Sequence, residues 1–93
     1  MKDEFERHLE KSLRDREFRI HFEAARSRRE IARKVALMRK TGGLTQSQLA
    51  SKIGTRQSNI ARLESATDTR MPSLELLGRV AKALGHRMII LFE

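Results

Sequence analysis

The strongest constraint on this fold is a set of closely spaced helix start and stop signals between residues 41 and 55. Thr41-Gly42-Gly43 predicts the end of one helix, because glycine adopts the left-handed conformation that closes helices. Thr45, with Gln48 three residues on, has the spacing of a capping box and starts the next helix. Gly54 stops that helix early, and Thr55 is placed to cap another. Two short helices are therefore predicted to meet at a sharp corner.

Apolar residues at helical spacing surround this corner and predict an all-α fold. A loop over Ser65 to Met71 precedes a last helix, which Pro72 and Ser73 start and Gly85 ends. The expected inward residues are Ile31, Val35, Leu37 and Met38 before the corner, Leu49, Ala50, Ile53, Ile60 and Leu63 around it, and Leu74, Leu77, Val80, Ala81 and Leu84 after it.

The first 27 residues combine charges of both signs with a narrow apolar stripe. Phe5, Leu9 and Leu13 repeat every four residues, and Phe18 and Phe22 follow after a break near Arg14 and Asp15. Asp15 is placed to cap a second helix there. Two amphipathic helices are predicted, and a stripe this narrow needs another surface to cover it.

The last eight residues have the character of a β-strand. Met88, Ile89, Ile90, Leu91 and Phe92 are apolar in succession, and the sequence offers no second strand. A single strand must pair outside its own fold, most simply with its copy across a two-fold axis. We therefore predict a homodimer joined through these residues, and three regions: 1–27, 28–85 and 86–93.

The charge of the chain predicts an anionic partner, either nucleic acid or a membrane surface. The net charge is +8, and residues 31–93, with eleven basic and four acidic residues, carry +7 of it. Four Phe, with no Trp or Tyr, offer few rings for base stacking, which argues against single-stranded nucleic acid. The arginines alternate with acids and lack a wide apolar face, which argues against a membrane.

Several other classes of protein are disfavoured. No cysteine is present, and His8, His21 and His86 are scattered, so no metal site is expected. The sequence has no nucleophile elbow and no glycine-rich phosphate loop, so we expect neither an enzyme nor a cofactor. Residues 1–10 are charged throughout, and the longest apolar run is five residues, so a cytoplasmic protein is expected.

The segment from Leu44 to Glu64 resembles the helix-turn-helix of the XRE family, the phage Cro and repressor proteins. The resemblance covers roughly Val35 to Gly85 and implies a five-helix, repressor-like bundle that binds operator DNA. It implies base contacts by Arg56, Gln57, Ser58 and Arg62, and backbone contacts by Gln46, Thr45, Thr55, Asn59 and Arg70. It also implies a structural ion pair between Arg39 and Glu64.

Physical chemistry agrees with these assignments. Arg suits the two acceptors of guanine and Gln suits adenine, each pairing being worth about 1–3 kcal/mol of discrimination. Gln46 opens a helix, where backbone N–H groups favour an anion. Taken alone, the polar run after Gly54 is more typical of a solvated helix start than of a DNA contact. Arg70, Lys40 and Lys52 are compatible with either phosphate contact or simple solvation.

The flanking regions resemble those of HigA-type antitoxins from type II toxin–antitoxin modules, both in the leader from Leu13 to Phe18 and in the tail from Ala83 to Phe92. The resemblance implies a RelE/HigB-like mRNA-cleaving toxin as partner, and an antitoxin that neutralises it and represses its own operon. Phe5, Leu9, Leu13, Phe18 and Phe22 would anchor the toxin. The same residues are equally suited to pack back on the bundle, which would leave a stand-alone XRE-family repressor.

Overall fold

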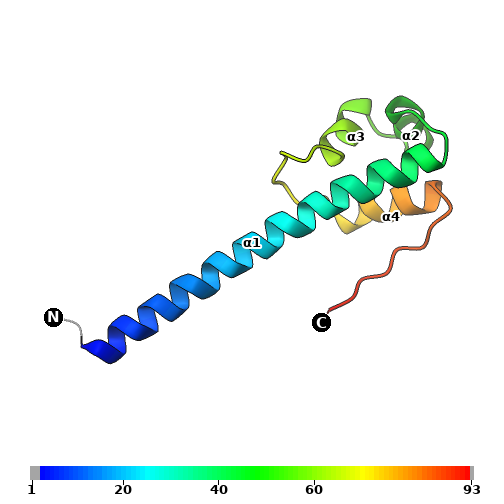
Figure 1. Cartoon of the computed structure of the whole chain (residues 1–93). Helices are drawn as coiled ribbons and strands as arrows, with labels where there is room; N and C mark the ends of the chain where they lie inside the picture. Colours follow the sequence, from blue (N-terminus) through cyan, green and yellow to red (C-terminus); the bar gives the residue numbers. More distant parts are fainter. Residues whose placement is uncertain (1–2, 93) are drawn as a thin grey trace.

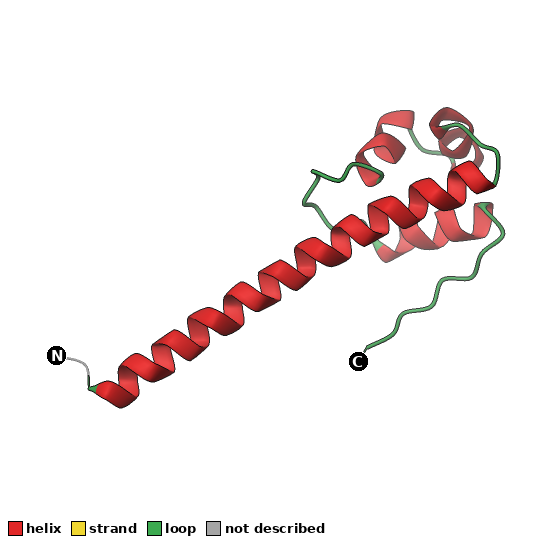
Figure 2. Ribbon diagram, in the orientation of Figure 1, coloured by secondary structure: helices red, strands yellow, loops and turns green. Residues whose placement is uncertain are grey.

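The computed structural model describes residues 3–92, except for the side chains of His21 and Phe22. Within this range the chain forms four α-helices and no strand (Figure 2). They are α1 (Glu4–Thr41), α2 (Gln46–Ile53), α3 (Gln57–Leu63) and α4 (Leu74–Ala83). The last three pack around the carboxy-terminal part of α1, while the rest of α1 extends away as a straight rod (Figure 1). We call residues 4–27 the arm and residues 28–85 the head.

The whole of α1 is one continuous helix of 38 residues, so the break predicted near Arg14 and Asp15 is wrong. Asp3 caps its start by accepting a hydrogen bond from the backbone N–H of Glu6 at 2.8 Å. No glycine or proline occurs between this cap and Gly42. Arg or Asp inside a helix costs less than about 1 kcal/mol relative to Ala. A possible cap at Asp15 is therefore not enough to end the preceding helix. The described residues form four helices in all, so the five-helix bundle that the resemblance implied is not observed.

The hydrophobic core lies where α2, α3 and α4 meet the head part of α1. Its buried members are Val35, Leu49, Ala50, Ile53, Ile60, Leu63 and Val80, with Ile31, Leu44, Leu76, Leu77, Ala83 and Leu84 packed around them. Leu37 and Leu74, which were predicted to point inward, are exposed, and Met38 is only half-buried. Leu37 follows Val35 by two residues, which places it on nearly the opposite side of the helix.

The carboxy-terminal tail, residues 86–92, has no regular secondary structure. Gly85 adopts φ +75°, and the backbone N–H of His86 donates to the carbonyl of Ala81 at 2.8 Å, which closes α4. Beyond this point the chain turns back from α4 (Figure 1), and its large apolar side chains are exposed, Phe92 to 91%. The predicted strand is not formed, because a strand needs a hydrogen-bonding neighbour. Pairing with a second copy stays a prediction.

Candidate functional site

The corner between α2 and α3 is built by the start and stop signals of the sequence. The Thr45 hydroxyl accepts from the backbone N–H of Gln48 at 3.1 Å, and the Gln48 side chain accepts from the Thr45 N–H at 2.8 Å. These two bonds complete the predicted capping box. Gly54 then closes α2 in the left-handed conformation, with φ 72°. The predicted pair of short helices is confirmed.

The start of α3 differs from the prediction that Thr55 caps it. The N-cap residue is Arg56, and its side chain makes no capping bond. The Thr55 hydroxyl instead accepts a hydrogen bond from the Asn59 side-chain amide at 2.8 Å. The backbone N–H of Thr55 donates to the Ala50 carbonyl of α2 at 2.9 Å, which holds Thr55 against α2. Helix α3 therefore begins at Gln57, directly after the N-cap residue Arg56, and both residues are exposed.

A chain of hydrogen bonds joins this exposed start of α3 to the interior. The Gln57 amide donates to the Gln46 amide oxygen at 2.8 Å, and the Gln46 amide donates to Glu64 at 3.2 Å. Glu64 in turn is bonded to Arg39 at 2.7 and 2.8 Å, and the third nitrogen of Arg39 donates to the Leu44 carbonyl. The first residues of α2 and α3 are thus held in a fixed relation. Each carboxamide keeps a second N–H that these bonds do not use.

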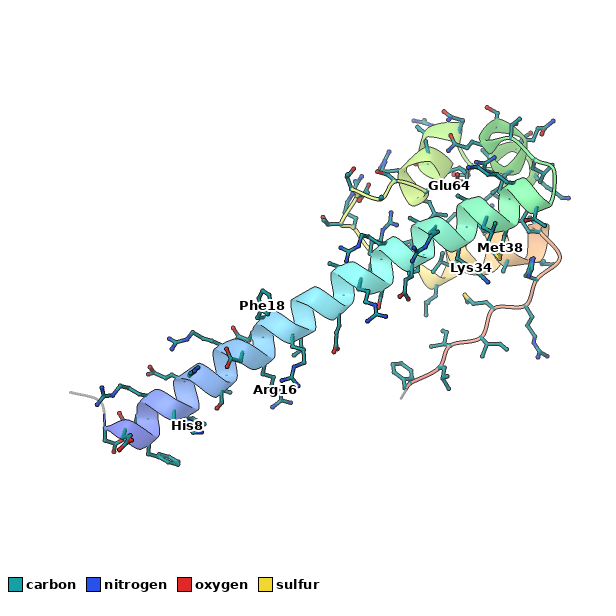
Figure 3. The ribbon with its side chains drawn as sticks, in the orientation of Figure 1. His8, Arg16, Phe18, Lys34, Met38 and Glu64 are labelled. Atoms are coloured by element: carbon teal, nitrogen blue, oxygen red, sulfur yellow. The ribbon has the colours of Figure 1, made fainter. Side chains whose placement is uncertain are left out.

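The ion pair at the inner end of this chain is buried. Glu64 lies after α3, on the side that faces α1 (Figure 3), and the two side chains of the pair are 10% and 5% exposed. Burial opposes ionisation of Glu64, but hydrogen bonds from Arg39 and Gln46 outweigh it and hold the pKa below its ordinary value. The same contact raises the pKa of Arg39. Both groups are therefore charged at neutral pH, and each satisfies the other.

The residues expected to read bases share one exposed stretch of the head. Arg56, Gln57 and Ser58 are exposed at the start of α3, and Arg62 is exposed one turn further on. Residues three and four apart on a helix lie on the same face, so Arg62 continues the surface of Ser58. The arrangement presents two guanidinium groups, a carboxamide and a hydroxyl to solvent, a donor-rich surface suited to base edges and phosphates.

Arg70, expected at the DNA backbone, is held within its own loop. Its guanidinium lies 3.0 Å from the Asp68 carboxylate, and its backbone N–H donates to the same carboxylate at 2.9 Å. These hydrogen bonds lower the pKa of Asp68 to about 2. The charge of Arg70 is therefore balanced by a neighbour, so a phosphate would have to compete with Asp68 for it.

Sequence reasoning missed Arg28, which is 4% exposed in the head. Its guanidinium donates to three backbone carbonyls, those of Arg62, Leu63 and Arg70. A signal for its burial does exist in the sequence. Arg28 stands four residues before Ala32 and seven before Val35, the spacing of the buried face of α1.

The apolar residues of the arm lie on two different sides of α1. With about 100° of turn per residue, Leu9, Leu13 and Ile20 share one face, and Phe18 points almost opposite to Ile20. Arg16, which shares the face of Leu9, and Phe18 leave the helix in opposite directions in Figure 3. A single flat partner surface would therefore not reach all of the expected toxin anchors, and their toxin contact stays a prediction.

The remaining arm residues fill in these two faces. Phe5 belongs with Leu9 and is 73% exposed, while Ile20, which the sequence reasoning left out, is 56% exposed. The side chain of Phe22 lies outside the described residues. In the part of the chain that the structure describes, no three His, Asp or Glu side chains cluster as metal ligands. None of the described helices is both long and apolar enough to cross a bilayer, since α1 is charged along its length.

Comparison with known proteins gives one match. A family model described as helix-turn-helix (HTH_3) matches residues 35–87, more than half of the chain. The matched region contains the whole of α2, α3 and α4 and leaves out the arm. No curated protein and no solved structure matches the chain.

Proposed function

This chain belongs to the helix-turn-helix family of XRE type, the domain of sequence-specific DNA-binding transcriptional regulators, and from this premise we propose that it is an antitoxin that represses its own operon. The observation that carries the DNA-binding part is the bond between Gln46 and Gln57. It fixes the starts of α2 and α3 beside each other, with Arg56, Ser58 and Arg62 exposed nearby.

In the proposed complex, α3 enters the major groove of operator DNA. Arg56 and Arg62 donate to guanine acceptors and Gln57 to adenine, while Ser58 bonds either base type. The start of α2, with Thr45 and Gln46, meets a backbone phosphate, as do Thr55, Asn59 and Arg70. The excess of positive charge in residues 31–93 draws the head to DNA and makes the affinity depend on salt.

The arm supports the proposed antitoxin role. It projects from the head and carries exposed apolar residues among charges of both signs. An exposed apolar face often marks a protein–protein contact, and the face shared by Leu9, Leu13 and Ile20 is exposed along the arm. An amphipathic helix laid in an apolar groove is a common mode of protein recognition, and a RelE/HigB-like toxin is the partner proposed for it.

The tail supports the proposed homodimer. Met88 to Phe92 are exposed apolar residues, and a second copy would pair with their backbone groups in a strand. Such pairing would place two α3 helices on a palindromic operator about 34–36 Å apart, or a multiple of this. Truncation after Gly85 should abolish the dimer in sedimentation measurements and most of the operator affinity. A truncated chain that remains a tight operator-binding dimer would refute this part.

Two experiments test the function as a whole. Selection from a random duplex library should enrich a palindromic site, and its affinity should fall steeply with salt. Co-purification with the product of the adjacent gene should recover a small basic ribonuclease, and deleting residues 2–14 should weaken that complex. DNA binding without any toxin partner would identify a stand-alone repressor. Absence of operator selection would exclude both roles.

A further inference from the structure

Arg28 is a buried cation that no part of the proposed DNA contact uses. Its Nε donates to the carbonyl of Arg70 at 2.8 Å, Nη1 to that of Leu63 at 3.0 Å, and Nη2 to that of Arg62 at 3.0 Å. The planar guanidinium therefore spans the end of α3 and the last part of the following loop. No carboxylate takes part in these three bonds.

Two of the three carbonyls that Arg28 binds, those of Arg62 and Leu63, belong to the last two residues of α3, and the Arg62 carbonyl also accepts the backbone N–H of Ser65 at 3.2 Å. The last carbonyls of a helix have no partner within it, and the end of the helix carries a partial negative charge. Helix α3 has only seven residues, too short to be stable without tertiary contacts. The Arg28 guanidinium, bonded to the backbone carbonyls of Arg62 and Leu63, therefore stabilises the end of α3 and fixes it against α1.

The loop between α3 and α4 depends on the same side chain. Arg70 is held from outside by its ion pair with Asp68, and its carbonyl is held from inside by Arg28. Arg28 and Arg39 stand eleven residues apart on α1 and are both buried. Arg39 holds Glu64 while Arg28 holds the residues just before it, so two arginines of one rigid helix fix the exit of α3.

We propose that Arg28 is a positioning residue for DNA recognition. It sets the orientation of α3 and of the loop after it, so that the exposed side chains of α3 meet base edges in register. Arg28 itself does not touch DNA, because it is buried and each of its three nitrogens already donates to a backbone carbonyl. The inference rests on the proposed function, but it concerns how the reading helix is held rather than what it reads.

The test compares three variants with the full-length wild type. Arg28→Gln removes the charge and the fork, Arg28→Lys keeps the charge without the fork, and Arg29→Gln removes one charge from the exposed neighbour. Affinity is measured for the duplex selected by the wild type and for a scrambled duplex, well below each variant's unfolding midpoint. Hydrogen exchange is followed at the backbone amides of α3 and α2 without DNA.

Arg29→Gln should lower both affinities by the same factor, because one charge contributes equally to all DNA. Arg28→Gln and Arg28→Lys should lower the ratio of specific to non-specific affinity at least tenfold, the effect of losing about one base contact. Exchange of the α3 amides should speed up at least tenfold relative to those of α2.

Unchanged ratio and unchanged α3 exchange in folded Arg28 variants would overturn the proposal. A lower unfolding midpoint with an unchanged ratio would also overturn it, since Arg28 would then be merely structural. A wild type without preference for any duplex would refute the proposed function instead. In that case the exchange measurement still decides whether Arg28 holds α3.

Discussion

The guanidinium of Arg39 and the carboxylate of Glu64 meet through two parallel hydrogen bonds, Nε to Oε2 at 2.7 Å and Nη2 to Oε1 at 2.8 Å. The pair joins α1 to the residue that follows α3, and through Gln46 it reaches the start of α2. Three helices therefore depend on one buried contact, which makes it the place where a single substitution should have the largest effect on stability.

Removing one partner of this pair should be costly. Arg39→Met leaves the Glu64 carboxylate buried without its counter-charge, and we expect a loss of about 3–5 kcal/mol in the free energy of unfolding. Adding Glu64→Leu should recover much of this loss, because both charges are then absent. Urea unfolding at neutral pH measures the free energy of unfolding of the single and the double variant. A cost below about 1 kcal/mol for Arg39→Met would contradict the role assigned to the pair.

Stability should fall on acidification in a way that depends on Glu64. Its pKa in the folded protein lies below the ordinary value of 4.5, so the folded state binds fewer protons than the unfolded chain. The contribution is complete above pH 4.5 and is lost as the pH falls through the lower, folded pKa. The pKa of Asp68 is also lowered, to about 2, so its contribution to stability has the same sign and is lost as the pH falls through that value. Unfolding midpoints measured against pH should decline less steeply for Glu64→Gln, and parallel curves would disprove the assignment.

Gln46 and Gln57 should act on DNA as a unit. Each substitution to Ala removes one partner of the 2.8 Å bond. Gln57 without Gln46 then loses its fixed direction, and Gln46 without Gln57 keeps only its bond to Glu64. Each should weaken operator binding by about 1–3 kcal/mol, and the double variant by less than the sum. Fluorescence anisotropy with the selected duplex measures the affinities of the wild type, the two single variants and the double variant. Strict additivity would show that the bond does not position these side chains.

Two glycines should respond in opposite directions to alanine. Gly54→Ala places a Cβ on a residue with φ 72° and should cost about 1–2 kcal/mol. Gly78 lies inside α4, and an added Cβ would meet only the Met88 side chain, at 3.6 Å. Gly78→Ala should therefore stabilise the protein by about 0.5–1 kcal/mol. Thermal unfolding of the two variants measures both changes. An unchanged unfolding midpoint for Gly54→Ala would mean that a side chain at this position does not strain the corner.

Deleting residues 2–14 should leave the stability of the head unchanged. The core contains no residue before Ile31, and Phe5, Leu9 and Leu13 are exposed. We expect the urea midpoint to shift by no more than the effect of a surface substitution, about 0.5 kcal/mol. A large decrease would contradict the extended arm, because it would require the arm to pack back on the bundle, the alternative that the sequence left open.

The sequence by itself determined the local structure around the corner. Gly54 and the Thr45–Gln48 capping box act within a few residues, so no distant contact is needed to predict two short helices there. The ion pair of Arg39 and Glu64 was also expected, but only through the resemblance to the XRE family. Residues 25 apart in the chain have no local signal that they meet.

Only the three-dimensional structure decided the features that the sequence signals left ambiguous. Asp15 is as good a cap by residue type as Thr45, yet α1 continues through it because nothing stops the helix before it. Because the helix is continuous, Phe18 and Ile20 lie on opposite sides of the arm. The prediction of two separate helices did not show that the apolar residues occupy two sides. Arg28 is buried and bonded to three backbone carbonyls only because α3 ends beside it. A sequence specifies which groups need partners, whereas packing alone brings a particular cation to a particular carbonyl.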